Sequence, residues 1–218
     1  MINLSNINKE YIDKYIKGLV PDRNEFFKGM EEYASENHIP IIEPEVAQYL
    51  KVHLKAFAPR KILEIGTAIG YSAIRFAEAL GGEGFVTTIE RREDMIELAL
   101  ENITASGYKK NINILQGEAD EILPTLKEKY DVIFIDAAKG HYLELFNMAL
   151  DLLEEDGMVI CDNVLFRGMV ATDKLVVRRK KTIVKRMRKF LKHINNLEGF
   201  SSTVIPIGDG LALIYRER

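Results

Sequence analysis

Lys61–Ile74 reads KILEIGTAIGYSAI and joins a short apolar run to a helix-like pattern through two glycines. The run Lys61–Gly66 has the nearly continuous apolar character of a strand that is buried on both faces of a sheet. Gly66 and Gly70 allow the backbone to turn tightly, and the helix that follows would present its free N–H groups there. This strand–turn–helix unit predicts an α/β fold with a ligand site at the end of its first strand.

The same alternation continues through most of the chain. Strand-like runs cover residues 61–66, 84–90, 112–117, 130–136 and 157–163, and helical patterns cover residues 71–80, 92–106, 119–127 and 142–153. Two more strand patterns flank Gly208-Asp209-Gly210, which is typical of a hairpin, and a long helix is expected over residues 175–197. We therefore predict a doubly wound, Rossmann-like α/β fold. Its seven-stranded sheet should be mostly parallel, with an antiparallel carboxyl-terminal strand.

The amino-terminal part of the chain has helical patterns only, over residues 2–20, 22–38 and 43–57. A chain of 218 residues with 47% hydrophobic content can bury one core of ordinary size. We therefore expect a single domain, 1–218, in which a helical cap (1–58) precedes an α/β core (59–218).

Composition also bears on location. No apolar run approaches the ~20 residues that a membrane-spanning helix needs, and the polar amino terminus does not look like a signal peptide. Cys161 is the only cysteine, which excludes an internal disulfide and fits a reducing cytoplasm. Since Cys161 lies in a strand-like run without a neighbouring histidine, we interpret it as a small core residue rather than a nucleophile. We expect a cytoplasmic protein that has no membrane partner.

The glycine turn departs from the dinucleotide-binding pattern G-x-G-x-x-G. Glu64 stands just before Gly66, where a carboxylate would repel a pyrophosphate but would suit a cationic ligand. Glu90 ends the next strand, at a position where an acid commonly holds a ribose diol. An adenosine ligand with a positive charge and no phosphate meets these requirements, and S-adenosyl-L-methionine is the leading candidate.

Glu118 and Ala119 follow the third strand and would border the adenine of that ligand. Structural interpretations stand beside the functional ones. The glycine turn could serve packing alone, Glu64 could be a buried acid satisfied within the core, and Glu90 could be an exposed acid at a strand end.

Hard oxygen ligands end the next two strands. Asp136 ends the fourth strand, and Asp162 and Asn163 end the fifth. Because ligands of open parallel sheets gather at the carboxyl ends of the strands, these side chains can converge at one point. Two carboxylates and an amide suit Mg²⁺ or another hard divalent cation such as Mn²⁺, and because no His or Cys accompanies them in the proposed ligand set, zinc is disfavoured. The alternative is that Asp162 and Asn163 only cap the loop that follows.

Lys139 lies three residues beyond Asp136, at the start of a predicted helix. A divalent cation at the strand ends would lower the pKa of a hydroxyl among two neighbouring substrate oxygens, and Lys139 could accept that proton. This role requires a lowered lysine pKa, which burial and a nearby dication both favour. An exposed lysine at a helix start is the alternative interpretation.

Charge is distributed unevenly along the chain. Arg167–Lys192 contains eleven Lys and Arg residues and one acid, although the whole chain has a net charge of −3. An apolar stripe in this segment consists of Ile183, Val184, Met187, Leu191 and Ile194. The cations proposed to contact RNA are Arg178, Arg179, Lys180, Lys181, Lys185 and Arg186. A polyanion bound there would present a base to the metal, although a merely solvated basic face is the usual interpretation of such a segment.

Five stretches of the chain together resemble the cation-dependent class I O-methyltransferases of the catechol and caffeoyl-CoA type. They are ILEIGTAIGYSAI, TIER, FIDAAKGHY, CDNVLFRG and IPIGDGLA. The resemblance covers nearly the whole chain. It implies S-adenosylmethionine as cofactor and metal ligands at Asp136, Asp162 and Asn163. It further implies cofactor contacts at Ile42, Ser72, Glu90, Ala119 and Asp136, with Glu64 and Gly66 in the turn, and it implies a homodimer.

A narrower similarity links the chain to the bacterial tRNA 5-hydroxyuridine methyltransferases. The stretches that carry it are HIPIIEPE, LEIGTAIGYSAIR, FIDAAKG and DNVLFRGMVA, the last of which is followed by a basic helix. Those enzymes make 5-methoxyuridine at the wobble position, and the 5-hydroxyl and 4-carbonyl of their acceptor are adjacent oxygens suited to chelation. The expected function is therefore metal-dependent O-methylation of tRNA. The alternatives are a small-molecule catechol or caffeoyl-CoA-type O-methyltransferase and a non-catalytic nucleic-acid-binding protein on the same fold. A nicotinamide dehydrogenase fits least, given Glu64 and the glycine spacing.

Overall fold

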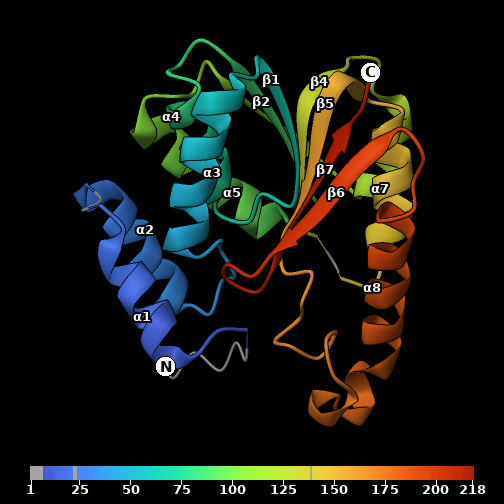
Figure 1. The fold of residues 1–218 in the computed structure, drawn as a ribbon. Helices are drawn as coiled ribbons and strands as arrows, with labels where there is room; N and C mark the ends of the chain where they lie inside the picture. Colours follow the sequence, from blue (N-terminus) through green and yellow to red (C-terminus); the bar gives the residue numbers. More distant parts are fainter. Residues whose placement is uncertain (1–6, 22–23, 138) are drawn as a thin grey trace. The chain divides into compact units, whose positions relative to one another are not determined.

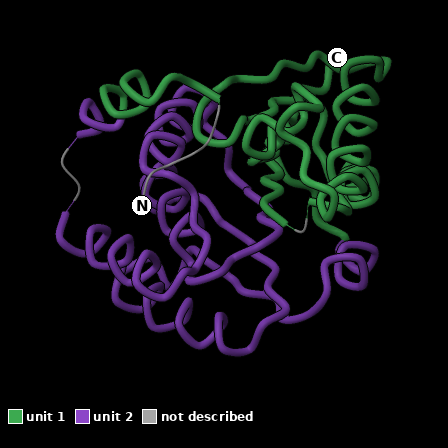
Figure 2. The backbone as a smooth tube through the Cα atoms, turned by 90° about the horizontal axis from the view of Figure 1, so that it is seen from below, with its two compact units in different colours: residues 1–16, 127–218 green, residues 17–126 purple. Residues whose placement is uncertain are grey.

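The computed structural model describes residues 7–21, 24–137 and 139–218, which form two compact units (Figure 2). The central unit is Lys17–Leu126, and the terminal unit combines the chain up to Ile16 with Lys127–Arg218. The single domain expected for 1–218, with its cap over 1–58 and its core over 59–218, stays a prediction.

The central unit has three parallel strands. Its elements are α2 (Glu25–Glu36), α3 (Pro44–Phe57), β1 (Lys61–Ile65), α4 (Tyr71–Ala79), β2 (Phe85–Glu90), α5 (Glu93–Ser106), β3 (Ile112–Gln116), α6 (Ala119–Ile122) and the 3₁₀ turn η1 (Leu123–Thr125). Ile65 of β1 pairs with Ile89 of β2, which pairs in turn with Leu115 of β3. The carboxyl ends of the three strands therefore lie at one edge, where α4 and α6 begin (Figure 1).

Local sequence sets the ends of these helices. The side chain of Asn24 accepts a hydrogen bond of 3.1 Å from the backbone N–H of Phe27 and so caps α2. Pro44 occupies the first turn of α3, where no intrahelical N–H bond is lost. Gly107 ends α5 with φ 83°, a left-handed conformation that glycine adopts at little cost.

The terminal unit holds the remaining strands and two long helices. Its elements are β4 (Tyr130–Ile135), α7 (Tyr142–Leu150), β5 (Leu153–Cys161), the 3₁₀ turns η2 (Asp173–Leu175) and η3 (Arg178–Lys180), α8 (Lys181–Ile194), β6 (Phe200–Ile205) and β7 (Leu211–Arg216). β4 and β5 are parallel, whereas β7 runs antiparallel to both β5 and β6. α7 and α8 lie side by side along these strands (Figure 1). The residues of α1 (Glu10–Leu19) are shared between the two units, and none of them is buried.

The predicted class of fold is confirmed. The strand order of the seven-stranded sheet is β3-β2-β1-β4-β5-β7-β6. Every strand expected from the sequence is present, and the hairpin around Gly208-Asp209-Gly210 joins β6 to β7.

The prediction of one long helix over residues 175–197 was wrong. α8 begins only at Lys181, and two separate 3₁₀ turns precede it. Val176 and Val177 between these turns have extended backbones, with ψ of 112° and 145°. β-branched side chains lose rotamer freedom in a helix, so two adjacent valines favour this break.

α8 packs within the terminal unit through a stripe that shares Val184, Met187 and Ile194 with the predicted one, adds Phe190, and leaves Ile183 and Leu191 only partly buried. The Phe190 ring lies edge-on to the rings of Tyr142 and Phe146 of α7, with centroids 5.7 and 5.6 Å away. These contacts hold the basic helix against α7.

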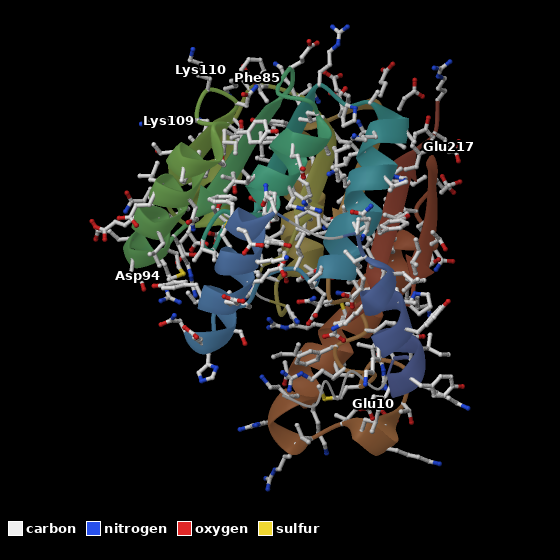
Figure 3. All side chains as sticks on the ribbon, turned by 90° about the vertical axis from the view of Figure 1, so that its left-hand side faces the viewer. Glu10, Phe85, Asp94, Lys109, Lys110 and Glu217 are labelled. Atoms are coloured by element: carbon white, nitrogen blue, oxygen red, sulfur yellow. The ribbon has the colours of Figure 1, made fainter. Side chains whose placement is uncertain are left out.

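Charged side chains occupy the outside of the central unit. Asp94 in the first turn of α5, and Lys109 and Lys110 beyond its last residue, point away from the unit (Figure 3). Within residues 7–21, 24–137 and 139–218, no helix combines the length and apolar character that crossing a membrane requires.

Candidate active site

The glycine turn of the central unit has the conformation that its glycines predicted. Gly66 has φ 105°, and its N–H donates a hydrogen bond of 3.0 Å to the carbonyl oxygen of Ile89 in β2. Gly70 has φ 82° and stands at the amino-terminal end of α4. A side chain at Gly70 would be strained by this backbone conformation and would contact Ala99 of α5 at 3.4 Å. The turn therefore depends on glycine at this position.

Glu90 at the end of β2 is tied to that turn. One oxygen of its carboxylate accepts a hydrogen bond of 3.0 Å from the N–H of Ala68, and the other accepts bonds of 2.9 and 3.0 Å from the N–H groups of Arg91 and Arg92. Ala68 itself has φ 45°, which is unusual for a residue with a side chain. Glu90 thus helps to fix the shape of the turn, a role that the sequence did not reveal.

Glu64 is fully buried beneath the turn. Its Oε2 accepts a hydrogen bond of 2.5 Å from the hydroxyl of Thr88, and that hydroxyl also contacts the hydroxyl of Thr67. The carboxylate is therefore satisfied at least in part within the core, in line with the structural interpretation of this residue. Its part in cofactor binding stays a prediction.

The other proposed cofactor contacts belong to the same unit. Ser72 is in the first turn of α4 and is 8% exposed, and Ile42 precedes α3 and is 3% exposed. Glu118 precedes α6, where its carboxylate lies 3.2 Å from the Arg91 guanidinium, and Ala119 is the first residue of α6. Ser72, Glu118 and Ala119 therefore lie at the end of the unit where the parallel strands terminate.

In the terminal unit the two strand ends do meet. Ile135 of β4 pairs with Cys161 of β5, so Asp136 and Asp162 follow directly at matched ends of neighbouring parallel strands. The N–H of Asp162 donates a hydrogen bond of 3.1 Å to the carbonyl oxygen of Ile135. Asp162 Oδ1 accepts a bond of 2.6 Å from the N–H of Asn163, whose φ is 57°. Asp162 therefore also caps the local backbone, as the structural alternative proposed.

The two carboxyl groups influence each other. Burial raises the pKa of Asp136, while the Lys139 ammonium opposes this shift. The pKa of Asp162 lies well above its usual value, first because the side chain is buried and second because the Asp136 carboxylate repels its charge. A cation bound near both groups would relieve this repulsion.

Lys139 lies beside these acids. Its Nζ donates a hydrogen bond of 2.7 Å to Asn163 Oδ1 and lies 3.8 Å from a carboxylate oxygen of Asp209. Nζ is also 5.3 Å from the centre of the Phe166 ring. Burial lowers the pKa of Lys139, while the carboxylates of Asp209, Asp136 and Asp162 oppose the shift. A partly buried lysine with a lowered pKa can exchange a proton near neutral pH more readily than an exposed one.

Sequence reasoning missed two members of this cluster. Asp209 was interpreted only as part of the β6–β7 turn, yet its Oδ1 accepts a hydrogen bond from the N–H of Arg167 and its carboxylate lies beside Lys139. Tyr142 donates a hydrogen bond of 2.7 Å from its hydroxyl to the carbonyl oxygen of Asp162. An acid between two glycines in a tight turn was the only sequence signal for Asp209.

The oxygen ligands available at the two strand ends are of the kind that a hard divalent cation prefers. Asp136 and Asp162 supply mutually repelling carboxylates, and Asn163 supplies an amide oxygen that already accepts a bond from a cationic group. Among the described residues, no three or more His, Cys, Asp and Glu side chains are grouped as a metal site. The metal and its three protein ligands stay a prediction.

Cys161, which precedes Asp162, is confirmed as a core residue. Its side chain is completely buried, and burial raises the pKa of the thiol. A thiol that does not ionise is a poor nucleophile.

The cations of the basic segment have different surroundings. Arg188 donates to the carbonyl oxygens of Val170 and Met169 and pairs with Asp173 at 2.7 Å, so it has a structural role. Lys180 lies 5.6 Å from the Phe166 ring, and Arg186 donates a hydrogen bond of 3.1 Å to the carbonyl oxygen of Gly140. The proposed RNA contacts Arg178, Arg179, Lys181 and Lys185 are exposed to solvent.

Known proteins match this chain closely. A catechol O-methyltransferase from Niastella koreensis is 33% identical over 167 residues, which cover 74% of this chain and 76% of the relative. A caffeoyl-CoA O-methyltransferase from Populus kitakamiensis is 29% identical over 225 residues, covering 95% and 92%. The structure of the O-methyltransferase TomG from Streptomyces achromogenes, in complex with S-adenosylmethionine, covers 100% of both chains with 27% identity and a TM-score of 0.84.

The comparison with family models agrees with these relatives. The model of the O-methyltransferase family matches residues 21–217, which include the glycine turn, both acidic strand ends and the basic helix. With a match over nearly the whole chain, and with the predicted fold in place, this protein belongs to the O-methyltransferase family.

Proposed function

We propose that this protein is a metal-dependent O-methyltransferase that uses S-adenosylmethionine and acts on 5-hydroxyuridine in tRNA. The main support for the proposal is that Asp136, Asp162 and Lys139 lie close together at the ends of β4 and β5. The product would be 5-methoxyuridine at the wobble position.

The acceptor hydroxyl must lose its proton before it can attack a methyl group. A divalent cation held by Asp136, Asp162 and Asn163 would lower the pKa of that hydroxyl. Lys139 Nζ would accept the proton, and the Asp209 carboxylate 3.8 Å away would stabilise the resulting ammonium. The bond to Asn163 Oδ1 fixes the position of Nζ, which favours transfer along a defined path.

The cofactor site is proposed in the central unit. S-adenosylmethionine supplies an electrophilic methyl group on a sulfonium. Glu90 would accept hydrogen bonds from the ribose, while its bonds to Ala68, Arg91 and Arg92 keep the carboxylate in place. Gly66 would allow close approach to the turn, and the buried carboxylate of Glu64 would favour the positive charge. Ser72, Ile42, Glu118 and Ala119 are the further proposed contacts, and TomG in its complex with the cofactor supports this class of ligand.

The tRNA acceptor is supported by charge. α8 contains no acid and several exposed cations, and it packs on α7, whose first turn follows Lys139. An RNA backbone is a polyanion whose phosphates such a surface could bind. Adjacent 5-hydroxyl and 4-carbonyl oxygens would suit a metal held by three protein ligands.

The decisive experiment is mass spectrometry of tRNA nucleosides. tRNA that contains 5-hydroxyuridine should gain one methyl group on that nucleoside after incubation with the protein, S-adenosylmethionine and Mg²⁺. If the nucleoside stays unmethylated while catechol is converted under the same conditions, the tRNA acceptor is wrong.

A small-molecule acceptor is the second candidate, and the names of the two curated relatives favour it. They are a catechol O-methyltransferase and a caffeoyl-CoA O-methyltransferase. Neighbouring phenolic hydroxyls could use the same metal and lysine, and the basic helix would then be incidental. Comparing kcat/KM for 5-hydroxyuridine-containing tRNA, catechol and caffeoyl-CoA distinguishes the two candidates. A non-catalytic nucleic-acid-binding protein would methylate none of them.

Two further properties remain proposals: a homodimer, which the family resemblance implies, and a cytoplasmic location, which the single cysteine favours. Sedimentation equilibrium should give twice the chain mass of 24.9 kDa if the protein is a dimer. A mass equal to one chain at micromolar concentration would exclude a stable dimer.

A further inference from the structure

A small hollow in the terminal unit opens beside Lys139. It has a volume of about 130 Å³ and lies between the start of α7 and one face of α8. Three cationic side chains line it, Lys139, Arg186 and Lys189, together with Gly140 and the first residues of α7. Lys189 was not among the residues that the sequence proposed for RNA contact.

The charge of the hollow favours an anion. Arg186 and Lys189 are three residues apart in α8 and therefore lie on the same face of that helix. Glu144 is the one acid among the lining residues, so cations outnumber it three to one. α8 itself contributes no carboxylate over Lys181–Ile194.

Arg186 is already oriented for binding. One terminal nitrogen of its guanidinium donates a hydrogen bond of 3.1 Å to the carbonyl oxygen of Gly140. A guanidinium has five N–H donors in a rigid fork, so most of them can serve a ligand. Tyr142 is 1% exposed and packs against Phe190, which keeps the two helices that form the hollow together.

The hollow adjoins the proposed metal ligands. Lys139 lines it, and the Nζ of the same lysine donates a hydrogen bond of 2.7 Å to Asn163 Oδ1. A group bound in the hollow would therefore share Lys139 with the proposed metal ligand Asn163. An acceptor that is anchored in the hollow would have its reactive hydroxyl near the acids of β4 and β5.

We propose that this hollow binds a phosphate group of the acceptor nucleotide, with Arg186 and Lys189 as its main ligands. The inference rests on the proposed function and specifies how that site recognises its substrate. Arg matches two oxygens of a phosphate through its fork, while Lys adds a point charge. A phosphate in this place would distinguish a nucleotide within RNA from a neutral phenol of similar ring size.

The first experiment compares acceptors with and without a phosphate. The acceptors are 5-hydroxyuridine, its 3′-monophosphate and its 5′-monophosphate, each assayed with S-adenosylmethionine and Mg²⁺. One of the two nucleotides should have a kcat/KM about tenfold higher than the nucleoside, equivalent to about 1.4 kcal/mol. In the double variant Arg186→Gln/Lys189→Gln, the ratio of kcat/KM for that nucleotide to kcat/KM for the nucleoside should fall to about one.

Two further variants serve as controls. Lys192→Gln removes one positive charge from the same helix at a position that does not line the hollow, so it should keep the wild-type ratio. Glu144→Gln removes the one opposing charge and should raise the ratio. Equal ratios in the double variant and in wild type would overturn the proposal, as would an equal loss in Lys192→Gln.

A second measurement is independent of methylation. Inorganic phosphate should raise the melting temperature of the wild type and of Lys192→Gln above that in sodium chloride of the same ionic strength, because a ligand that binds the native state stabilises it. The double variant should show no such difference. If phosphate stabilises the wild type through Arg186 and Lys189 but 5-hydroxyuridine is never methylated, the proposed function fails and the phosphate site stands. If tRNA is methylated but phosphate neither stabilises the wild type nor improves the acceptor, the phosphate site fails alone.

Discussion

Asp162 is a buried acid at the end of β5. Its side chain is 1% exposed, and its pKa lies well above the usual value because of burial and the nearby Asp136 carboxylate. Asp162→Ala should reduce methyl transfer at saturating Mg²⁺ by about 100-fold or more, because even residues that only support a metal ligand typically contribute 10–100-fold. Activity assays over a range of Mg²⁺ concentrations measure this loss. Compared without metal, the variant loses the repulsion between Asp162 and Asp136 but also the hydrogen bond from the Asn163 N–H, so its stability to denaturant should stay close to that of the wild type. Wild-type turnover by a folded Asp162→Ala would remove Asp162 from the metal site.

Glu90 combines an expected cofactor contact with an observed structural one. Glu90→Ala should weaken binding of S-adenosylhomocysteine by roughly 1.5–3 kcal/mol, because it removes a charged acceptor and leaves the N–H of Ala68 without this partner. Isothermal titration calorimetry measures the change. Asp94→Ala is a suitable comparison, because the Asp94 carboxylate is exposed, pairs with Arg92 and is not among the proposed cofactor contacts. An unchanged affinity in Glu90→Ala would exclude Glu90 from the cofactor site.

At the scale of elements, α8 is held by its buried face. Phe190 is completely buried against Tyr142 and Phe146, whereas Leu191 is partly exposed. Phe190→Ala should lower the free energy of unfolding by about 3–5 kcal/mol, because it leaves a cavity between α7 and α8. Leu191→Ala should cost about 1 kcal/mol. Urea denaturation of both variants tests this order, and an equal loss would contradict the packing of α8.

The 3₁₀ turn η3 and the start of α8 carry exposed cations that are proposed to contact RNA. Arg178→Ala/Arg179→Ala/Lys181→Ala should weaken tRNA binding and flatten its salt dependence, by about 0.7 in the log–log slope for each lost contact with a single strand and about 0.9 with a duplex. Lys180 is left unchanged, because its Nζ lies 5.6 Å from the Phe166 ring and its loss could disturb the loop. Filter binding at several salt concentrations gives the slope. If slope and affinity match the wild type, η3 is only a solvated surface.

For the whole molecule, metal should matter for the reaction and little for the fold. The largest buried side chains are apolar or aromatic and come from both units, so the core does not depend on an ion. EDTA should therefore stop methyl transfer while changing the thermal unfolding midpoint only slightly, and Mg²⁺ or Mn²⁺ should restore activity. Enzyme assays paired with circular dichroism melts test both statements. Full activity in EDTA would exclude the metal mechanism.

Much of this architecture follows from local pattern. The strand–helix alternation, the two glycines of the turn and the acids at the ends of β4 and β5 can all be identified from the sequence alone. They are predictable because side-chain periodicity and backbone freedom act over a few residues, and because parallel strands in register bring their ends together. The prediction of a helix over residues 175–197 was wrong for a related reason. It relied on the periodic apolar stripe and did not consider the preference of Val176 and Val177 for an extended backbone.

The sequence by itself determined the order of the strands and helices, the family resemblance and the acids at two strand ends. Only the tertiary structure placed Asp209 beside Lys139, made Phe190 rather than Leu191 the anchor of α8, and tied Glu90 to the N–H of Ala68. The first two depend on packing between segments far apart in the sequence, and the third depends on β1 lying beside β2 in register. Such contacts form only after distant strands have paired and helices have packed against the sheet, so no local pattern predicts them.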